Sequence, residues 1–312
     1  MLDIGGTIMG PNGILILHKP RGMTSHDCVM KIRRLFQTKK VGHTGTLDPD
    51  VNGVLPICIG KATKVVEYMS GYSKQYEGEV TIGYSTTTED KSGETVESKK
   101  VEAQWTKDMI TETIAEFQGE IIQVPPMYSA VKVNGKRLYE YARKNQEVER
   151  PSRNVTIHSI ELLSDLTYTN DTMSFRFRVH CSKGTYIRTL AVDIGKKLGY
   201  PAHMSDLVRT SSGPYHLSES FTFEELEVRK ESDTLLETLI PFDTAVHFLP
   251  KVVIDEETEM QVKNGSVLPS EKGLEENRFT VYNKKGECLA VYMHHPTKKG
   301  VIKPEKMFWT GE

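Results

Sequence analysis

The carboxylate of Asp48 stands in a segment whose residue types suit a reactive loop. The segment reads Gly42-His43-Thr44-Gly45-Thr46-Leu47-Asp48-Pro49. Its two glycines let the backbone bend tightly and let a ligand approach closely. Pro49 lacks a backbone donor and biases Asp48 toward an extended or turn conformation. We therefore predict a reactive carboxylate carried on a loop, with an ordinary Asp-Pro turn as the alternative.

Two other kinds of chemistry are suggested by short patterns near Asp48. The sequence Asp48-Pro49-Asp50 has the D-x-D core of Mg²⁺-dependent aspartyl phosphotransferases, in which the first Asp is the nucleophile and the second the acid or base. That chemistry requires an apolar strand directly before the first Asp, and residues 42–47 do not form an apolar run. Residues 60–63 resemble the end of a phosphate loop, but Leu55 and Ala62 occupy positions that require Gly and Ser or Thr. The phosphotransferase stays as a rival hypothesis.

The composition indicates a globular protein that needs no metal. The chain has 312 residues, 38% hydrophobic and 26% charged. No apolar run approaches the roughly 18 residues of a membrane helix, and no secretory signal begins the sequence. The four cysteines are far apart, without metal-ligand spacing. We expect a cytoplasmic protein with reduced thiols, no metal site and no membrane contact.

The charge is distributed unevenly along the chain. The whole sequence carries a net charge of −2, while residues 217–260 hold 12 acidic and 3 basic residues, a net of −9. The remainder therefore sums to +7. Residues 129–153 alone carry seven Lys or Arg against three Glu. Because binding to a polyanion depends on the local surface, this pattern is compatible with a nucleic-acid partner, although an ordinary solvated face would look similar.

The hydrophobic pattern predicts a mixture of strands and helices rather than strict alternation, which favours an α+β fold. Strands are predicted at 14–17, 54–59, 76–84, 154–163 and 172–181, with an Asn-Gly hairpin at 131–136. Helices are predicted after a cap at Thr24 or Ser25, at 106–118, at 185–198 and within the acidic 217–245 region. Short strands at 251–254, 278–282, 288–293 and 301–302 suggest a small β-rich module. We place the domain boundary near 246–250 and expect residues 1–12 to be a disordered leader.

Seven segments, in order along the chain, resemble the motifs of one enzyme family. They are residues 19–25, 42–49 with the continuation 53–64, 74–76, 86–90, 124–132, 184–188 and 207–210. Each match is modest alone, but together they are similar to the TruB family of tRNA pseudouridine synthases from about residue 13 to residue 215. The resemblance implies a pseudouridine synthase fold, a mixed and mainly antiparallel sheet with flanking helices and a central cleft. It further implies a catalytic domain at 13–246, with a basic insertion at about 125–153, and a PUA-like β-barrel that binds RNA at 247–312.

The resemblance also implies the catalytic residues. Asp48 would be the essential carboxylate, acting by attack at ribose C1′, by attack at uracil C6, or through a glycal route. Arg188 would form a bidentate pair that keeps Asp48 ionised and oriented. Tyr76 would stack on the target base with its hydroxyl ready for proton transfer. Without the resemblance, Arg188 would be interpreted as a helix-surface residue and Tyr76 as part of the core.

Five further residues are implied to bind the substrate. Leu207 would form the apolar floor of the base pocket, and His43 would fill the place that the flipped base leaves. Thr44 and Asp90 would hydrogen-bond the RNA, and Lys19 would hold phosphates together with the basic hairpin of residues 129–153. Alternative interpretations are core packing for Leu207 and turn or cap positions for the other loop residues.

The expected activity is isomerisation of uridine to pseudouridine in the T-loop of tRNA, at position 55, without a cofactor. The expected partner is the T-stem-loop of tRNA. We expect a monomer without an obligate protein partner. A tRNA-folding factor that flips bases, and a guide-dependent synthase acting on rRNA, are the two alternatives.

Overall fold

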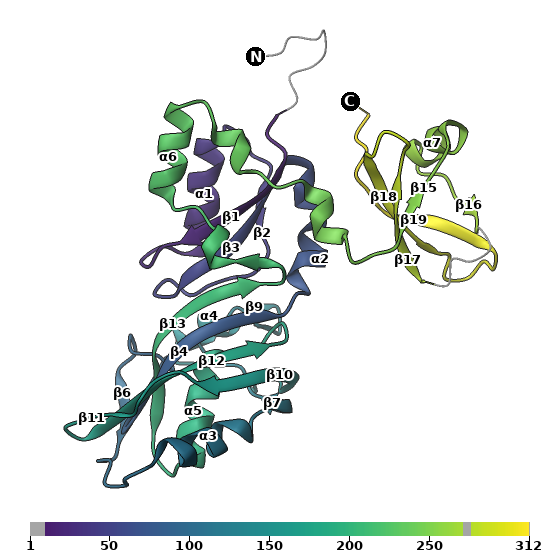
Figure 1. Ribbon diagram of the computed structural model, residues 1–312. Coiled ribbons are helices and arrows are strands. Elements are labelled where there is room, and N and C mark those ends of the chain that lie inside the picture. The colour runs from purple at the N-terminus through teal and green to yellow at the C-terminus, as the bar shows by residue number, and fades with distance from the viewer. Residues whose placement is uncertain (1–9, 271–275, 312) are drawn as a thin grey trace.

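The computed structural model describes residues 10–270 and 276–311 and is built around one large mixed sheet (Figure 1). The main path of this ten-stranded sheet is β1-β3-β13-β4-β12-β10-β7. In that order the strands are Gly13–Lys19, Asn52–Ile59, Ala202–Ser212, Lys74–Ile82, Thr172–Cys181, Arg153–Leu162 and Gly119–Gln123. Short strands β2 (Val41–His43), β11 (Thr167–Thr169) and β14 (Tyr215–His216) pair with β3, β12 and β13. The predicted α+β class is confirmed.

The two halves of the large sheet meet where β13 runs parallel to β3, while the other pairs along the main path are antiparallel. At this junction Arg209 pairs with Gly53, which has φ +118°. A Cβ atom on Gly53 would lie 2.2 Å from the backbone oxygen of Arg209. Glycine is therefore required here for the two strands to approach.

Separate groups of helices cover the two halves of the sheet. Helix α1 (Ser25–Leu35) begins with a capping box at Thr24 and packs beside α6 (Phe223–Glu231) over β1 and β3. Helices α3 (Lys107–Ala115) and α5 (Ile187–Lys197) pack over β4, β12 and β10. Each half of the sheet thus has its own hydrophobic core. The junction of β3 and β13 lies between these two cores.

Several short elements lie outside the main path of the sheet and the four larger helices. They are the hairpins β5–β6 (Tyr84–Thr86, Thr95–Ser98) and β8–β9 (Lys132–Val133, Lys136–Arg137), the short helices α2 (Val66–Ser70) and α4 (Leu138–Ala142), and the 3₁₀ turns η1 (Gly60–Val65), η2 (Leu217–Glu219), η3 (Leu235–Thr238) and η4 (Phe242–Val246). The β8–β9 turn has positive φ at Asn134 and Gly135, as the Asn-Gly signal predicts.

Two local predictions need correction. Gly42 and His43 are not in an irregular loop, because β2 pairs them with β3. The 217–245 region is helical only in α6 and otherwise forms 3₁₀ turns. The pairing of β2 depends on a strand that is distant in the sequence, so the residue types at Gly42 and His43 do not reveal it. Between β10 and β12 the chain also forms strand β11, and Asn170 in the following turn has φ +52°.

The C-terminal module is a five-stranded sheet that lies beside the main body (Figure 1). Its strands, in the order β15-β17-β18-β19-β16, are Lys251–Val253, Arg278–Tyr282, Cys288–His294, Val301–Met307 and Leu268–Pro269. Helix α7 (Glu256–Lys263), which the strand-based prediction missed, is capped by Asp255. The sheet fits a PUA-like domain, as expected.

The C-terminal module packs against the larger body and forms a hydrogen bond with it. Val291 and Phe308 of the module share a hydrophobic cluster with Ile14 and Ile16 of β1. Lys64 Nζ also donates to the Met307 carbonyl at 2.8 Å. None of the described helices is long and apolar enough to cross a membrane. Of the expected leader, residues 1–9 lie outside the described residues.

Candidate active site

A pocket of about 480 Å³ opens at the junction of the two sheet halves. Its wall is formed by the 43–48 segment, β4, β13, the start of α5 and the beginning of the insertion. The predicted residues that line it are His43, Thr44, Asp48, Tyr76, Arg188 and Leu207. A second pocket of about 280 Å³ lies on the other side of Asp48 and Arg188 and also contacts Asp90 and Leu207. Lys19 lines neither pocket.

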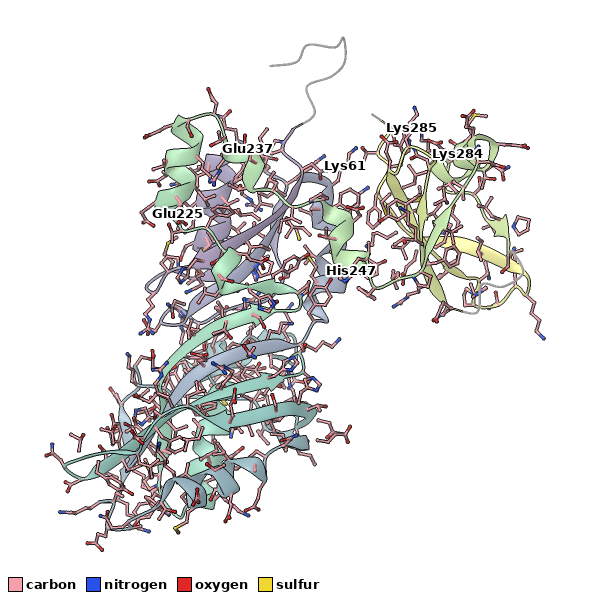
Figure 2. The ribbon with its side chains drawn as sticks, viewed as in Figure 1. Lys61, Glu225, Glu237, His247, Lys284 and Lys285 are labelled. Atoms are coloured by element: carbon pink, nitrogen blue, oxygen red, sulfur yellow. The ribbon has the colours of Figure 1, made fainter. Side chains whose placement is uncertain are left out.

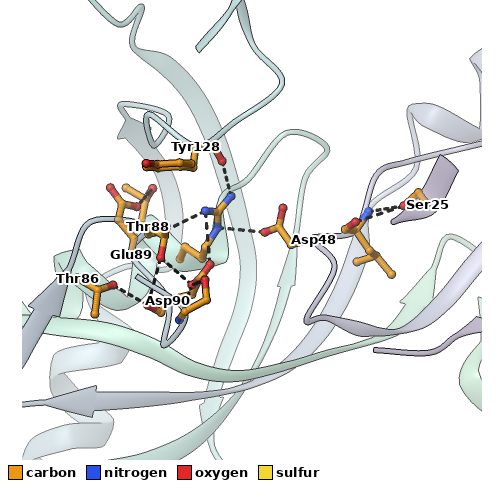
Figure 3. Close-up of polar contacts among 11 residues, drawn as sticks. Ser25, Asp48, Thr86, Thr88, Glu89, Asp90 and Tyr128 are labelled. Atoms are coloured by element: carbon orange, nitrogen blue, oxygen red, sulfur yellow. Dashed lines mark hydrogen bonds and ion pairs between the residues drawn. The ribbon is translucent and has the colours of Figure 1, made fainter. Parts of the chain in front are cut away.

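Arg188 is buried and directed at Asp48. The guanidinium Nε lies 3.1 Å from Asp48 Oδ2, and the side chain is 6% exposed. Its other nitrogens donate to the backbone carbonyls of Thr88 and Tyr128, each at 2.9 Å. Figure 3 shows Asp48 on one side of this network, with Thr88, Asp90 and Tyr128 on the other. The ion pair with Asp48 is made through Nε alone. A bidentate pair was expected, and the structure shows a single contact instead.

The ionisation of Asp48 is set by opposing effects. Burial in the pocket wall raises the pKa of the carboxyl above its usual value, and nearby Asp90 and Asp50 add to the rise. Arg188 acts in the opposite direction, as does the more distant Lys19. The pKa remains raised on balance, so the arginine limits the effect of burial rather than reversing it.

Tyr76 projects from β4 into the pocket beside a second arginine. Burial raises the pKa of its hydroxyl, and Arg209 opposes the rise. Arg209 is almost completely buried, and it donates from Nε to the Val54 carbonyl at 2.7 Å and from Nη2 to the Gly45 carbonyl at 3.4 Å. It therefore joins β3, β13 and the 42–49 segment. The sequence motif 207–210 contains this arginine, but nothing in the sequence indicates that it is buried.

Leu207 takes the position expected of a pocket floor. It contacts both pockets and packs against β4, where a Cβ atom on Gly78 would lie 3.0 Å from Leu207 Cδ1. It also belongs to the larger hydrophobic core. Leu207 therefore both lines a pocket and packs in the core, and its role as the floor of a base pocket stays a prediction.

His43 and Thr44 lie at the start of the pocket wall. Burial lowers the pKa of the His43 imidazole, and the positive charge of Arg209 lowers it further, so a neutral ring is favoured. The buried atoms His43 Nδ1 and Thr44 Oγ1 have no hydrogen-bond partner among the described residues. A hydrogen bond with the Gly45 backbone acts in the other direction on the pKa of His43, and neither atom is exposed at the pocket surface.

Lys19 and Asp90 are positioned differently from expectation. Lys19 is fully buried, and its ammonium donates to the carbonyls of Pro20, Pro49 and Val51 at 2.9, 3.1 and 2.7 Å. It has no surface left for an RNA phosphate and instead holds the turn that follows Asp48. Asp90 Oδ1 accepts from Thr88 Oγ1 at 2.7 Å and from the Ser92 amide at 2.9 Å. Its other oxygen lies 3.7 Å from Arg188.

Comparison with known proteins identifies the family. The model for the TruB family pseudouridylate synthase N-terminal domain matches residues 33–187, and that for the tRNA pseudouridylate synthase B C-terminal domain matches residues 188–247. The chain belongs to the TruB family. The tRNA pseudouridine synthase B of Halalkalibacterium halodurans is 61% identical over 96% of this chain and 98% of the relative. That of Bacillus subtilis strain 168 is 55% identical over 95% and 97%.

Solved structures agree with the TruB assignment. A chain of a Cbf5-Nop10-Gar1 complex is 30% identical, with a TM-score of 0.71, over 96% of this chain and 85% of that chain. A chain of an H/ACA RNP bound to a substrate RNA containing 2′-deoxyuridine is 28% identical, with a TM-score of 0.70, over 96% and 86%. The predicted pseudouridine synthase fold is confirmed. The protein is accordingly an isomerase, and the phosphotransferase hypothesis for Asp48 and Asp50 is wrong.

The described residues contain no group of three or more His, Cys, Asp or Glu side chains arranged to hold a metal ion.

Proposed function

We propose that this chain converts the uridine at position 55 in the T-loop of tRNA to pseudouridine. The observation that carries the proposal is the pair of Asp48 and buried Arg188, 3.1 Å apart in a pocket between two sheet halves. Relatives 55–61% identical are named tRNA pseudouridine synthase B, which supports tRNA as the substrate. The T-loop position comes from the resemblance of the motifs.

The reaction breaks the bond between uracil N1 and ribose C1′, rotates the base and rejoins it through C5. Atoms and electrons balance within the nucleotide, so neither a redox step nor a transferred group is needed. Asp48 is the proposed essential carboxylate, by attack at C1′, by attack at C6 or by abstraction of a sugar proton. Arg188 orients it and favours its ionised form, and Tyr76 stacks on the base with its hydroxyl near the ring.

The depth of the site supports base flipping. Tyr76 of β4 and Leu207 of β13 both line the main pocket. A base stacked in an RNA loop would have to be extruded from the stack to reach them. His43, at the start of that wall, is the proposed side chain that takes the vacated place. Thr44 and Asp90 are the proposed hydrogen-bonding residues. The structure supports Thr44 more strongly, because its hydroxyl is unpartnered.

The RNA-binding surface is proposed to include the basic insertion of residues 125–153. Seven of its residues between 129 and 153 are Lys or Arg, and Tyr139 and Arg143 of the insertion border the smaller pocket beside Asp48. In this proposal residues 13–246 form the catalytic domain and residues 247–312 a PUA-like RNA-binding domain. The protein acts as a monomer in the cytoplasm, without an obligate protein partner.

The position can be tested with unmodified tRNA transcripts. Pseudouridine is mapped after carbodiimide treatment and reverse transcription, using one transcript with U55 and a matched transcript with C55. We expect one new stop, at position 55, that disappears in the second transcript. Modification at another uridine, or of an rRNA fragment in preference to tRNA, would overturn the proposed substrate.

A further inference from the structure

Unpartnered buried polar atoms gather at the main pocket. Across the described residues, six buried side-chain nitrogen or oxygen atoms have no hydrogen-bond partner. Three of them belong to residues that line the pocket: His43 Nδ1, Thr44 Oγ1 and Ser129 Oγ. A buried polar atom without a partner destabilises the folded state, so such atoms are rare unless a ligand or water satisfies them. His43 and Thr44 already have a proposed role, and Ser129 has none.

The backbone around Ser129 is held on both sides. The preceding carbonyl, that of Tyr128, accepts a hydrogen bond from Arg188 Nη2 at 2.9 Å, and Figure 3 shows Tyr128 in the network that contains Asp48. The carbonyl of Ser129 itself accepts from the Tyr139 amide, at the start of α4, at 3.2 Å. Ser129 is 5% exposed. Its hydroxyl therefore sits on a fixed backbone, in a pocket wall, one residue from the group that holds Arg188.

A buried serine with a structural role looks different in this protein. Ser25, 2% exposed, accepts a hydrogen bond from the Leu47 amide at 2.9 Å. Its hydroxyl is satisfied by the protein and stabilises the 42–49 segment. The Ser129 hydroxyl has the same burial and no such partner.

We propose that the hydroxyl of Ser129 binds the substrate directly, by donating a hydrogen bond to an oxygen of the target nucleotide. This inference rests on the proposed function and names one of its contacts. Hydroxyl side chains commonly bind the sugar and phosphate oxygens of nucleic acids. The contact joins the beginning of the basic insertion to the target nucleotide, one residue away from the Tyr128 carbonyl that accepts a hydrogen bond from Arg188.

The direct test compares Ser129→Ala with wild-type protein on an RNA hairpin that carries the T-arm sequence. Deleting the hydroxyl removes no hydrogen bond within the protein, so thermal stability should not fall. The value of kcat/KM should fall about 10- to 100-fold, the usual effect of one lost hydrogen bond in a closed site. Ser220→Ala is the matched control: Ser220 Oγ donates to the Leu217 carbonyl at 2.6 Å, and the residue lines no pocket, so this variant should keep full activity.

A second variant separates hydrogen bonding from packing. Ser129→Cys preserves the shape of the side chain but donates hydrogen bonds weakly. If the hydroxyl binds substrate, Cys loses most of the activity that Ala loses. If Ser129 merely fills space, Cys restores wild-type kcat/KM, and that result overturns the proposal.

The identity of the oxygen is tested with a hairpin that has 2′-deoxyuridine at the target position, using binding affinity as the readout. If Ser129 binds the 2′-hydroxyl, Ser129→Ala weakens binding of the normal hairpin but not of the deoxy hairpin. If the acceptor is a phosphate or uracil oxygen, the mutation weakens both. Wild-type affinity and kcat/KM in Ser129→Ala contradict the inference and leave the proposed function intact. An inactive wild-type enzyme on this hairpin and on full tRNA instead contradicts the proposed function.

Discussion

At the residue scale, the chemistry depends on the balance between a buried arginine, Arg188, and a partly exposed carboxylate, Asp48. Asp48 is pushed toward its neutral form by burial, and Arg188 opposes that push. Arg188 is itself held by hydrogen bonds to the carbonyls of Thr88 and Tyr128. The guanidinium therefore already has its position beside the Asp48 carboxylate and does not have to move during the reaction. Whether Asp48 acts as a nucleophile or as a base, its carboxyl group has to be ionised.

This balance predicts a pH dependence. The raised pKa of Asp48 means that activity is present above that pKa and is lost as the pH falls through it. Arg188→Gln removes the charge that lowers the pKa, so the acidic limb of kcat/KM should move to higher pH, together with a loss of rate. The measurement is the pH profile of kcat/KM for both proteins.

Arg178→Gln is the matched control for that profile. Arg178 pairs with Glu77 and Glu161 and lines neither pocket. Its acidic limb should coincide with that of the wild type. An unshifted limb in Arg188→Gln would show that Arg188 does not influence the ionisation of Asp48.

The buried Lys19 leads to a prediction about stability. Lys19→Met leaves the carbonyls of Pro20, Pro49 and Val51 without this donor, so we expect a loss of about 2 kcal/mol of folding free energy and reduced activity. Denaturant unfolding and kcat measure the two effects. Lys31→Met, which removes a partly exposed ion pair with Glu227, should change stability little. If Lys19→Met kept full stability and weakened RNA binding alone, the phosphate role would be correct instead.

The Gly-rich context singled out Asp48, and the motif resemblance singled out Arg188. The structure brings the two side chains to 3.1 Å, while their catalytic roles stay predictions. Burial was not visible in the sequence. Three of the residues discussed are buried by strands and loops that are distant in the sequence: Lys19, Arg209 and Ser129. The spacing of residues along the chain does not indicate such burial.

At the element scale, the junction of β3 and β13 determines where the pocket lies. The pairing of β13 with β4 places Arg209 opposite Tyr76, and the pairing of β13 with β3 brings in the segment before β3, which carries Asp48. The strands themselves could be predicted from alternating hydrophobicity, as β4 and β12 show. Their order could not, because the β3–β13 pairing joins residues about 155 positions apart, as in the contact of Arg209 with Val54.

Gly53→Ala tests the junction. The added Cβ would lie 2.2 Å from the Arg209 backbone oxygen, and the φ of +118° also disfavours Ala, so we expect a loss of about 3 kcal/mol. The measurement is denaturant unfolding. Gly42→Ala, where the new atom would meet Val66 Cγ2 at an ordinary 3.6 Å, serves as the comparison. Equal stability of the two variants would mean that the strands do not pair as closely as described.

At the scale of the whole molecule, charge is uneven along the chain, and the acidic 217–260 stretch runs from the main body into α7 of the C-terminal module. Figure 2 shows Glu225 and Glu237 on the part of the main body around α6, and Lys284 and Lys285 on the C-terminal module. The acidic 217–260 stretch hides a basic remainder in the net charge of −2. Binding to tRNA should follow the local surface rather than this total.

The basic insertion should therefore control the salt dependence of binding. Replacing Lys136 and Arg137 with Gln should lower affinity for tRNA and reduce the slope of log K against log salt by up to about 1.5, if both contact phosphates. Filter binding over a range of salt concentrations measures this. Replacing Lys196 and Lys197, at the end of α5, with Gln should leave the slope unchanged. Identical slopes in the three proteins would remove the insertion from the RNA interface.

The central claim is that Asp48 in this pocket is the essential carboxylate of a tRNA pseudouridine synthase. It is tested most directly by release of tritium from C5-labelled uridine in unmodified tRNA, with wild type and Asp48→Asn side by side, in the presence of EDTA, and with tRNA binding measured in parallel. We expect one equivalent of tritium per tRNA from the wild type, none from Asp48→Asn, and similar binding by both. Release by Asp48→Asn at the wild-type rate, or no release by either protein, would contradict it.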